Sequence, residues 1–210
     1  MASSTARLLG LAGSLLVLAS LLLAFLAVVL AVYATIVELE RERSLLGSWS
    51  RTLLLASPAL WITGWLLVLL ALRAVSRVAR RPSIFRDALL AFISLLASAW
   101  GLALIVAVAI AFSRSLVLGL LAALLFGVAS LALIALGLLA NGFFLYKAMS
   151  SATRATGIDS FRKAGLAFLS RSISIILVFT IAIAPLLELL GAVFLLIAFY
   201  SLRFSAIEVE

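Results

Sequence analysis

Residues 164–202 read AGLAFLSRSISIILVFTIAIAPLLELLGAVFLLIAFYSL, and this stretch decides how many helices the chain is expected to form. Its 39 residues would span about 58 Å as one helix, whereas the hydrocarbon core of a bilayer is about 30 Å thick. Pro185 lies near the middle and Glu188 follows it. Because proline suits a turn or the first turn of a new helix, we divide the stretch into helices over 164–183 and 185–203.

Four further apolar runs lie upstream of this stretch. Runs rich in Leu and Ala, without period-two alternation, indicate helices, and a backbone in hydrocarbon must satisfy its own hydrogen bonds. The expected helices are 8–37, 52–72, 88–113 and 115–146, with loops over 73–87 and 147–163. The sequence therefore predicts an all-α fold: a polytopic transmembrane bundle of about six helices, arranged as three hairpins in a single domain, 1–210.

The start of the second helix has two interpretations. Ser57 and Pro58 would suit the beginning of a helix, but that start leaves few apolar residues before Arg73. Either the helix starts near Thr52 and kinks at Pro58, or residues 44–56 lie in the membrane interface.

Composition supports membrane insertion. The chain is 67% apolar and 11% charged, whereas a soluble domain is about 45–50% apolar and about 25% charged. The net charge of +8 lies in gaps between apolar runs, which favours contact with anionic headgroups near Arg73, Arg77, Arg80 and Arg81 over binding of nucleic acid. Gln is absent and Asn occurs once, a bias found in thermophilic proteins and in GC-rich genomes.

The distribution of basic residues predicts the orientation. With the N-terminus inside, twelve Arg and Lys residues face the cytoplasm and four face outside. Six helices then also place the C-terminus inside. We expect a multi-pass protein of the cell membrane with both termini in the cytoplasm.

A short repeat relates two of the expected hairpins. FRDALLAFIS begins at Phe85 and FRKAGLAFLS begins at Phe161, and seven of ten positions are identical. Both copies open a helix at the expected cytoplasmic face, so helices 3–4 and 5–6 would be parallel repeats. A common way of starting a transmembrane helix, with Arg at the interface and apolar residues after it, gives the same pattern.

Three polar residues inside the apolar runs are candidates for function. Asn141, the single amide, is expected to bond a neighbouring helix, with contact to a substrate as the alternative. Arg171 is expected to reach the headgroups, with an anion or lipid phosphate as its alternative partner. Glu188 is expected near the outer end of its helix, where it suits the helix dipole. Arg171 and Glu188 are then about one helix length apart and not a direct pair.

Small residues recur in the fourth expected helix. Gly119, Ala123 and Gly127 have a spacing of four, which lets two helices approach closely. The approach could serve the core of the bundle or a seam between copies of the chain. Trp61 and Trp65 share one face of the second helix and are expected to pack.

The missing residue types limit the chemistry. Without Cys and His, the chain has no disulfide, thiolate zinc site, iron–sulfur cluster or bis-histidine haem. We find no phosphate-binding loop, dinucleotide fingerprint or nucleophile elbow. No catalytic, cofactor or metal residues are therefore predicted, and an enzyme is not expected. The first hypothesis is an accessory, assembly or structural subunit acting through helix–helix contacts with other membrane subunits or with itself. The alternative is a transporter or channel for a small, weakly polar solute.

Two ends of the sequence carry a family resemblance. ARLLGLAGSL at 6–15, FRKAGLAFL at 161–169 and GAVFLLIAFYSL at 191–202 resemble a family of small prokaryotic membrane proteins, common in archaea and known only as a domain of unknown function. The resemblance covers about a third of the chain, and the long middle section departs from the family pattern. It implies membrane location and an all-helical fold, and it supplies no activity or site residues.

Overall fold

The computed structural model describes residues 2–36, 40–177 and 183–202, and within these ranges the secondary structure is helical without a strand. The helices are α1 (Ala2–Ile36), α2 (Glu40–Val78), α3 (Pro82–Arg114), α4 (Leu116–Ala122), the π-helical turn η1 (Ala123–Gly127), α5 (Val128–Thr156), α6 (Asp159–Ile176) and α7 (Ala184–Tyr200). Since α4, η1 and α5 follow one another without a break, the described chain forms six rods. The predicted all-α bundle of about six helices is confirmed.

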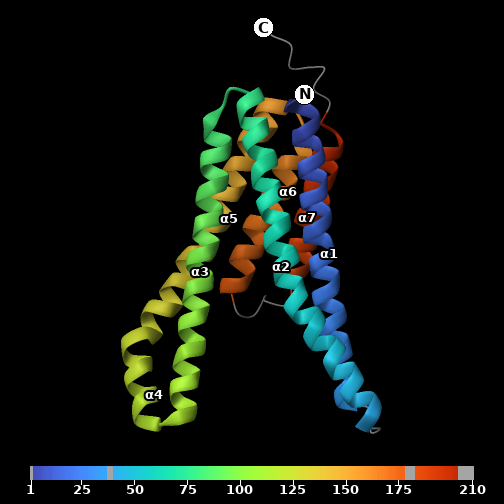
Figure 1. Cartoon of the computed structure of the whole chain (residues 1–210). Coiled ribbons are helices and arrows are strands. Elements are labelled where there is room, and N and C mark those ends of the chain that lie inside the picture. The colour runs from blue at the N-terminus through green and yellow to red at the C-terminus, as the bar shows by residue number, and fades with distance from the viewer. Residues whose placement is uncertain (1, 37–39, 178–182, 203–210) are drawn as a thin grey trace.

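The six rods form a closed ring in chain order. Each rod packs on the next one, and α7 packs on α1. The antiparallel pairs α1–α2, α3–α5 and α6–α7 are the three hairpins, and the start of α1 lies at the same end of the bundle as the end of α7 (Figure 1). The chain therefore encloses an interior to which every hairpin can contribute side chains.

The hairpins differ in length. Helices α6 and α7 have 18 and 17 residues, about 27 and 26 Å, whereas α1, α2 and α3 have 35, 39 and 33 residues. In Figure 1 the pairs α1–α2 and α3–α5 continue past the α6–α7 hairpin and diverge. All six rods are thus present together only in the half of the bundle that holds the start of α1 and the end of α7.

That half ends in two tight turns. The α2–α3 turn occupies residues 79–81, and the α5–α6 turn occupies 157–158. Arg80 and Gly157 adopt left-handed backbone angles, with φ of 50° and 71°, which reverse the chain within a few residues. We call this the basic end, because these exposed or half-exposed residues lie at or near it: Arg73, Arg77, Arg80, Arg81, Lys147, Arg154 and Arg162.

The loops predicted over 73–87 and 147–163 are wrong. Helix α2 continues to Val78, α3 starts at Pro82, α5 continues to Thr156 and α6 starts at Asp159. Hydropathy marks where the side chains leave the hydrocarbon, but Arg, Ala and Lys are good helix formers, so a helix can continue into water. The breaks predicted between 113 and 115 and before Pro185 are present, with α3 ending at Arg114 and α7 starting at Ala184.

The second helix starts earlier than the expected Thr52. Residues 44–56 belong to α2, which starts at Glu40, and Pro58 lies inside this helix. A proline removes one backbone hydrogen bond without necessarily ending a helix, and the bundle tolerates that loss here.

Four helical segments are long and apolar enough to cross a membrane: Ser4–Tyr33, Ser48–Val78, Pro82–Arg114 and Gly119–Thr156. Helix α7 is apolar but shorter. Large apolar side chains such as Leu22, Phe25 and Val128 are exposed, which lipid tails tolerate and water does not. The chain is therefore a membrane protein.

The two copies of the short repeat start helices that run in the same direction from the basic end (Figure 1). Their matched residues differ in environment. Phe161 is fully buried against Phe199, whereas Phe85 is half-buried beneath the Arg73 guanidinium, 5.5 Å from its ring centre. The two copies therefore share a way of starting a helix, but their matched residues do not share a packing position.

Candidate functional site

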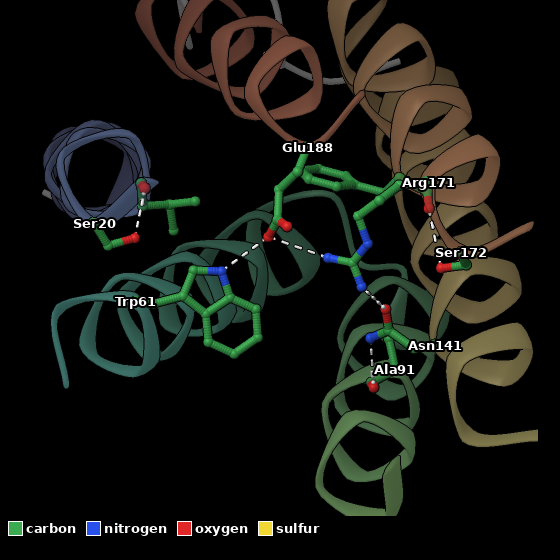
Figure 2. A network of polar contacts seen from close by, with 9 residues as sticks. Ser20, Trp61, Ala91, Asn141, Arg171, Ser172 and Glu188 are labelled. Carbon is green, nitrogen blue, oxygen red and sulfur yellow. Dashed lines mark hydrogen bonds and ion pairs between the residues drawn. The ribbon is translucent and has the colours of Figure 1, made fainter. Parts of the chain in front are cut away.

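A chain of polar contacts crosses the interior of the bundle. Trp61 Nε1 donates to Glu188 Oε1 at 2.9 Å, and Arg171 Nη1 lies 3.1 Å from the same oxygen. On the other side of the guanidinium, Nη2 lies 3.5 Å from Asn141 Oδ1, and Asn141 Nδ2 donates to the Ala91 carbonyl oxygen at 2.8 Å (Figure 2). We call these four side chains, Trp61, Glu188, Arg171 and Asn141, the central network. Together with the Ala91 carbonyl they join five of the six rods.

The pairing of Arg171 with Glu188 corrects the prediction from sequence, which placed them about one helix length apart. Helix α6 ends at Ile176, and α7 starts at Ala184, so the two residues lie at similar distances on either side of one hairpin turn. The expected helix over 164–183 put that turn seven residues too late and moved Arg171 toward a membrane surface. In the structure the Arg171 side chain is 5% exposed, so it does not reach headgroups.

Asn141 makes an interhelix hydrogen bond from α5 to the backbone of α3. It also accepts the long contact from Arg171, so the amide ties the packing of two helices to the ion pair. Trp61 joins the pair from α2, and its ring lies edge-on to Trp65 with ring centres 6.2 Å apart. Both tryptophans pack as expected, with Trp65 also edge-on to Phe168 at 5.1 Å between ring centres, and Trp61 in addition donates to the Glu188 carboxylate.

The central network lies deep in the apolar layer. Arg171 follows the exposed Arg162 by nine residues, about 13 Å along α6. Trp61 precedes the exposed Arg73 by twelve residues, about 18 Å along α2. Half of a hydrocarbon core is about 15 Å thick, so both distances place the network near the middle of the core.

A small cavity adjoins the network. It has about 20 Å³ of room, enough to hold water, and its wall includes Arg171, Asn141, Trp61 and Trp65 among apolar side chains of α2, α3 and α5. Close to this cavity, Arg171 Nε and Trp65 Nε1 are fully buried without a hydrogen-bond partner. A buried donor without an acceptor costs about 1–3 kcal/mol, so these two atoms destabilise the packing around the network.

A larger apolar hollow borders the Glu188 side chain. Its volume is about 530 Å³, and it is lined by α1, Ile175 of α6 and the first turn of α7. Glu188 is the charged residue in its wall. Arg171 thus lines the small cavity, and its partner Glu188 lines the hollow.

Asp87 is a second buried acid, although the sequence pattern placed it among the residues of a solvated loop. It is 1% exposed on α3, with Arg86 Nε 3.5 Å from Oδ1 and Lys147 Nζ of α5 3.9 Å from Oδ2. Neither carboxylate oxygen has a hydrogen bond. The loop was wrong because α3 starts at Pro82 and turns Asp87 inward with Ile84, Ala88 and Ala91.

The small-residue series lies away from the network. Gly119 is buried against the Phe112 ring within the α3–α4 hairpin, whereas nothing lies within 4 Å of the position that a Cβ on Gly127 would take. Ala123 begins the π-helical turn. Because a π-helix bonds residue i to residue i+5, a spacing of four residues no longer keeps side chains on one face of this rod. In the part of the chain that the structure describes, no three His, Cys, Asp or Glu side chains form a group that could hold a metal ion.

Residues 60–199 match the model of a family described as "Protein of unknown function (DUF996)". The match includes the middle section, which had been expected to depart from the family, and it excludes residues 6–15, on which part of the resemblance rested. No curated protein and no solved structure matches the chain. All four side chains of the central network fall inside the matched range.

Proposed function

Because the chain belongs to this family of unknown function, an activity has to be inferred from the geometry, and we propose that the protein is a membrane transport protein for a small polar solute. The observation that carries the proposal is the Arg171–Glu188 pair in the interior of the bundle, where Arg171 lines a small cavity and Glu188 lines an open apolar hollow. The catalytic alternative stays disfavoured, since neither His nor Cys is present for acid–base or nucleophilic chemistry.

The cost of the pair supports this proposal. A charged residue at the centre of a membrane helix costs about 2.5–3.5 kcal/mol on insertion scales. Replacing a buried ion pair by apolar residues of similar volume is often neutral or stabilising, so stability alone does not call for these charges. A pathway that must offer hydrogen bonds to a passing solute does call for them.

The shape of the bundle adds a second argument. Substrate sites of many transporters lie near the bilayer midplane, where helices shorter than the membrane end. Here α6 ends five residues after Arg171, and α7 starts four residues before Glu188, between two longer helix pairs (Figure 1). An accessory subunit, which was our first expectation, requires apolar contacts but no polar interior.

Flux measurements on the purified protein in liposomes test the proposal. Swelling is followed by light scattering with urea, acetamide, sodium formate and sodium acetate as permeants, in vesicles with and without protein. We expect at least one solute to enter faster with the wild-type protein. The variant Arg171→Met/Glu188→Leu, which keeps an apolar core, should lose that flux, whereas Arg162→Met on the exposed face of α6 should keep it.

The same preparation can refute the proposal. If no solute enters faster than into protein-free vesicles, and the protein isolated from native membranes carries a stoichiometric partner, the accessory role is correct instead. Loss of flux in Arg162→Met as well as in the double variant would show that the flux does not depend on the central network.

A further inference from the structure

We infer that the apolar hollow beside Glu188 binds a neutral single-chain alcohol from the lipid, with the hydroxyl donating to the Glu188 carboxylate and the alkyl chain lying against α1. The inference goes beyond the proposed transport function and does not rest on it, because it concerns binding of an amphiphile and not passage of a solute. It is drawn from the exposure of the wall, the second oxygen of Glu188, the charge balance of the ion pair and the size of the hollow.

The hollow opens on the outside of the bundle. Phe25, Val28 and Pro185 in its wall are exposed, whereas Ala184 is buried. Because the central network lies near the middle of the hydrocarbon core, the surface around this opening contacts lipid tails and not water. A ligand therefore reaches the hollow through the bilayer, which requires an apolar body.

Glu188 supplies the charged side chain of this wall, and its carboxylate is not fully used. Both of its contacts in the central network, from Trp61 and Arg171, end on Oε1, as the two dashed lines that meet at one oxygen in Figure 2 show. The side chain is 15% exposed, and because it lines the hollow, a ligand there meets its exposed part. Oε2 makes no contact within the network, so it can accept a hydrogen bond from a hydroxyl.

The charge of the ion pair selects a neutral head group. Arg171 Nη1 lies 3.1 Å from Glu188 Oε1, so the carboxylate already has its counter-charge. A cationic amphiphile would leave a net charge in the apolar layer, which is costly. An anionic amphiphile would do the same and would also face the like charge of the carboxylate. A neutral alcohol keeps the balance and adds a hydrogen bond to an ionised acceptor.

The size and the wall of the hollow select a single chain. Its volume of about 530 Å³ lies within the range of about 300–1,000 Å³ that small-molecule sites have. Leu21 and Phe25 of α1 and Ile175 of α6 offer apolar surface to an alkyl chain. Because lipid tails are as apolar as this wall, the chain is accepted without gaining much affinity, and the hydrogen bond to Glu188 decides which amphiphile is retained.

Photolabelling of the whole protein in lipid nanodiscs tests the inference. The probe is 1-octanol with a diazirine in its chain, which bonds to neighbouring side chains on illumination, and mass spectrometry locates the labelled residues. We expect saturable labelling of the α1 and α7 residues that line the hollow. Unlabelled 1-octanol should compete, whereas octane, octyltrimethylammonium, sodium octanoate and the two-chain alcohol dioctanoylglycerol should each need at least a tenfold higher concentration.

Three variants separate this site from labelling elsewhere on the lipid-facing surface. Ala24→Phe places a ring in the hollow from α1 without removing a member of the ion pair, so labelling of the wall should fall at least tenfold. Leu22→Phe, at an exposed position of α1 that does not line the hollow, should leave the labelling unchanged. Glu188→Gln removes the counter-charge of Arg171, so octanoate should become the better competitor, at least tenfold stronger than octanol.

Each other result contradicts the inference. A folded protein, with cooperative thermal unfolding, that shows no saturable labelling of the wall has no such site. Equal competition by octane would identify a hollow that any acyl chain fills, and stronger competition by octyltrimethylammonium would identify a cation site on the carboxylate. Stronger competition by dioctanoylglycerol would identify a two-chain lipid of the bilayer as the occupant. Unchanged labelling in Ala24→Phe would place the probe outside the hollow, and an unchanged preference for octanol in Glu188→Gln would refute the argument from charge balance.

Discussion

Removing Glu188 should destabilise the bundle more than removing Glu188 and Arg171 together. The single change Glu188→Leu leaves the guanidinium of Arg171, 5% exposed, without its counter-charge. An uncompensated buried charge of this kind costs about 3–5 kcal/mol. For a chain of this size, 1 kcal/mol corresponds to about 2–4 °C in Tm, so the Tm should fall by about 6–20 °C.

Adding Arg171→Met to Glu188→Leu should then raise the Tm again. The double variant keeps the loss of an acceptor for Trp61 Nε1, about 1–3 kcal/mol, and it also loses the Arg171 contact to Asn141 Oδ1, which is weak at 3.5 Å. The second substitution therefore restores about 2 kcal/mol, or about 4–8 °C. Thermal unfolding in detergent, followed by tryptophan fluorescence and by recovery of monodisperse protein, measures both steps.

The sign of the second step decides the outcome. If Arg171→Met lowers the Tm of the Glu188→Leu protein further, the two charges are not coupled, and the pair described for the interior is wrong. Arg162→Met, which removes an exposed charge from the same helix, serves as the control and should give no recovery.

Two further predictions concern packing and orientation. Gly13→Ala should lower the Tm by about 2–12 °C, because the new Cβ would lie 2.7 Å from the Gly64 carbonyl oxygen and overpacking costs about 1–3 kcal/mol. The control Gly127→Ala, with nothing within 4 Å of its Cβ, should leave the Tm unchanged or raise it. Equal effects of the two variants in thermal unfolding would contradict the close α1–α2 approach. The chain has no Cys, so a single cysteine reports topology: in intact cells an impermeant thiol reagent should miss Ser83→Cys and label Ser113→Cys, and the opposite pattern would reverse the proposed orientation.

The short α6–α7 hairpin shows where hydropathy was informative and where it failed. Pro185 correctly divided the last apolar run, because a long run cannot be one membrane helix. The boundary itself was misplaced, since residues 177–183 are as apolar as the helices beside them and mark no end. That error of a few residues was enough to separate Arg171 from Glu188.

The near-symmetry of Arg171 and Glu188 about the break before Pro185 could have indicated their pairing. In an antiparallel hairpin, residues at equal distances from the turn lie side by side. No comparable signal pointed to Asp87, because a lone acid among several Arg residues resembles a solvated loop, and its burial follows from the rotation of α3.

The amino-acid sequence by itself determined that the chain enters a membrane as a bundle of about six helices in three hairpins. Composition and run length are sufficient for that, since they depend on the free energy of each residue in lipid and not on its neighbours. Only the tertiary structure decided that Trp61, Asn141, Arg171 and Glu188 meet. These residues come from four helices, and the helices have no distinctive apolar stripe that would show which face turns inward. The inward face of each helix is therefore set by how all six rods pack around one another in the ring.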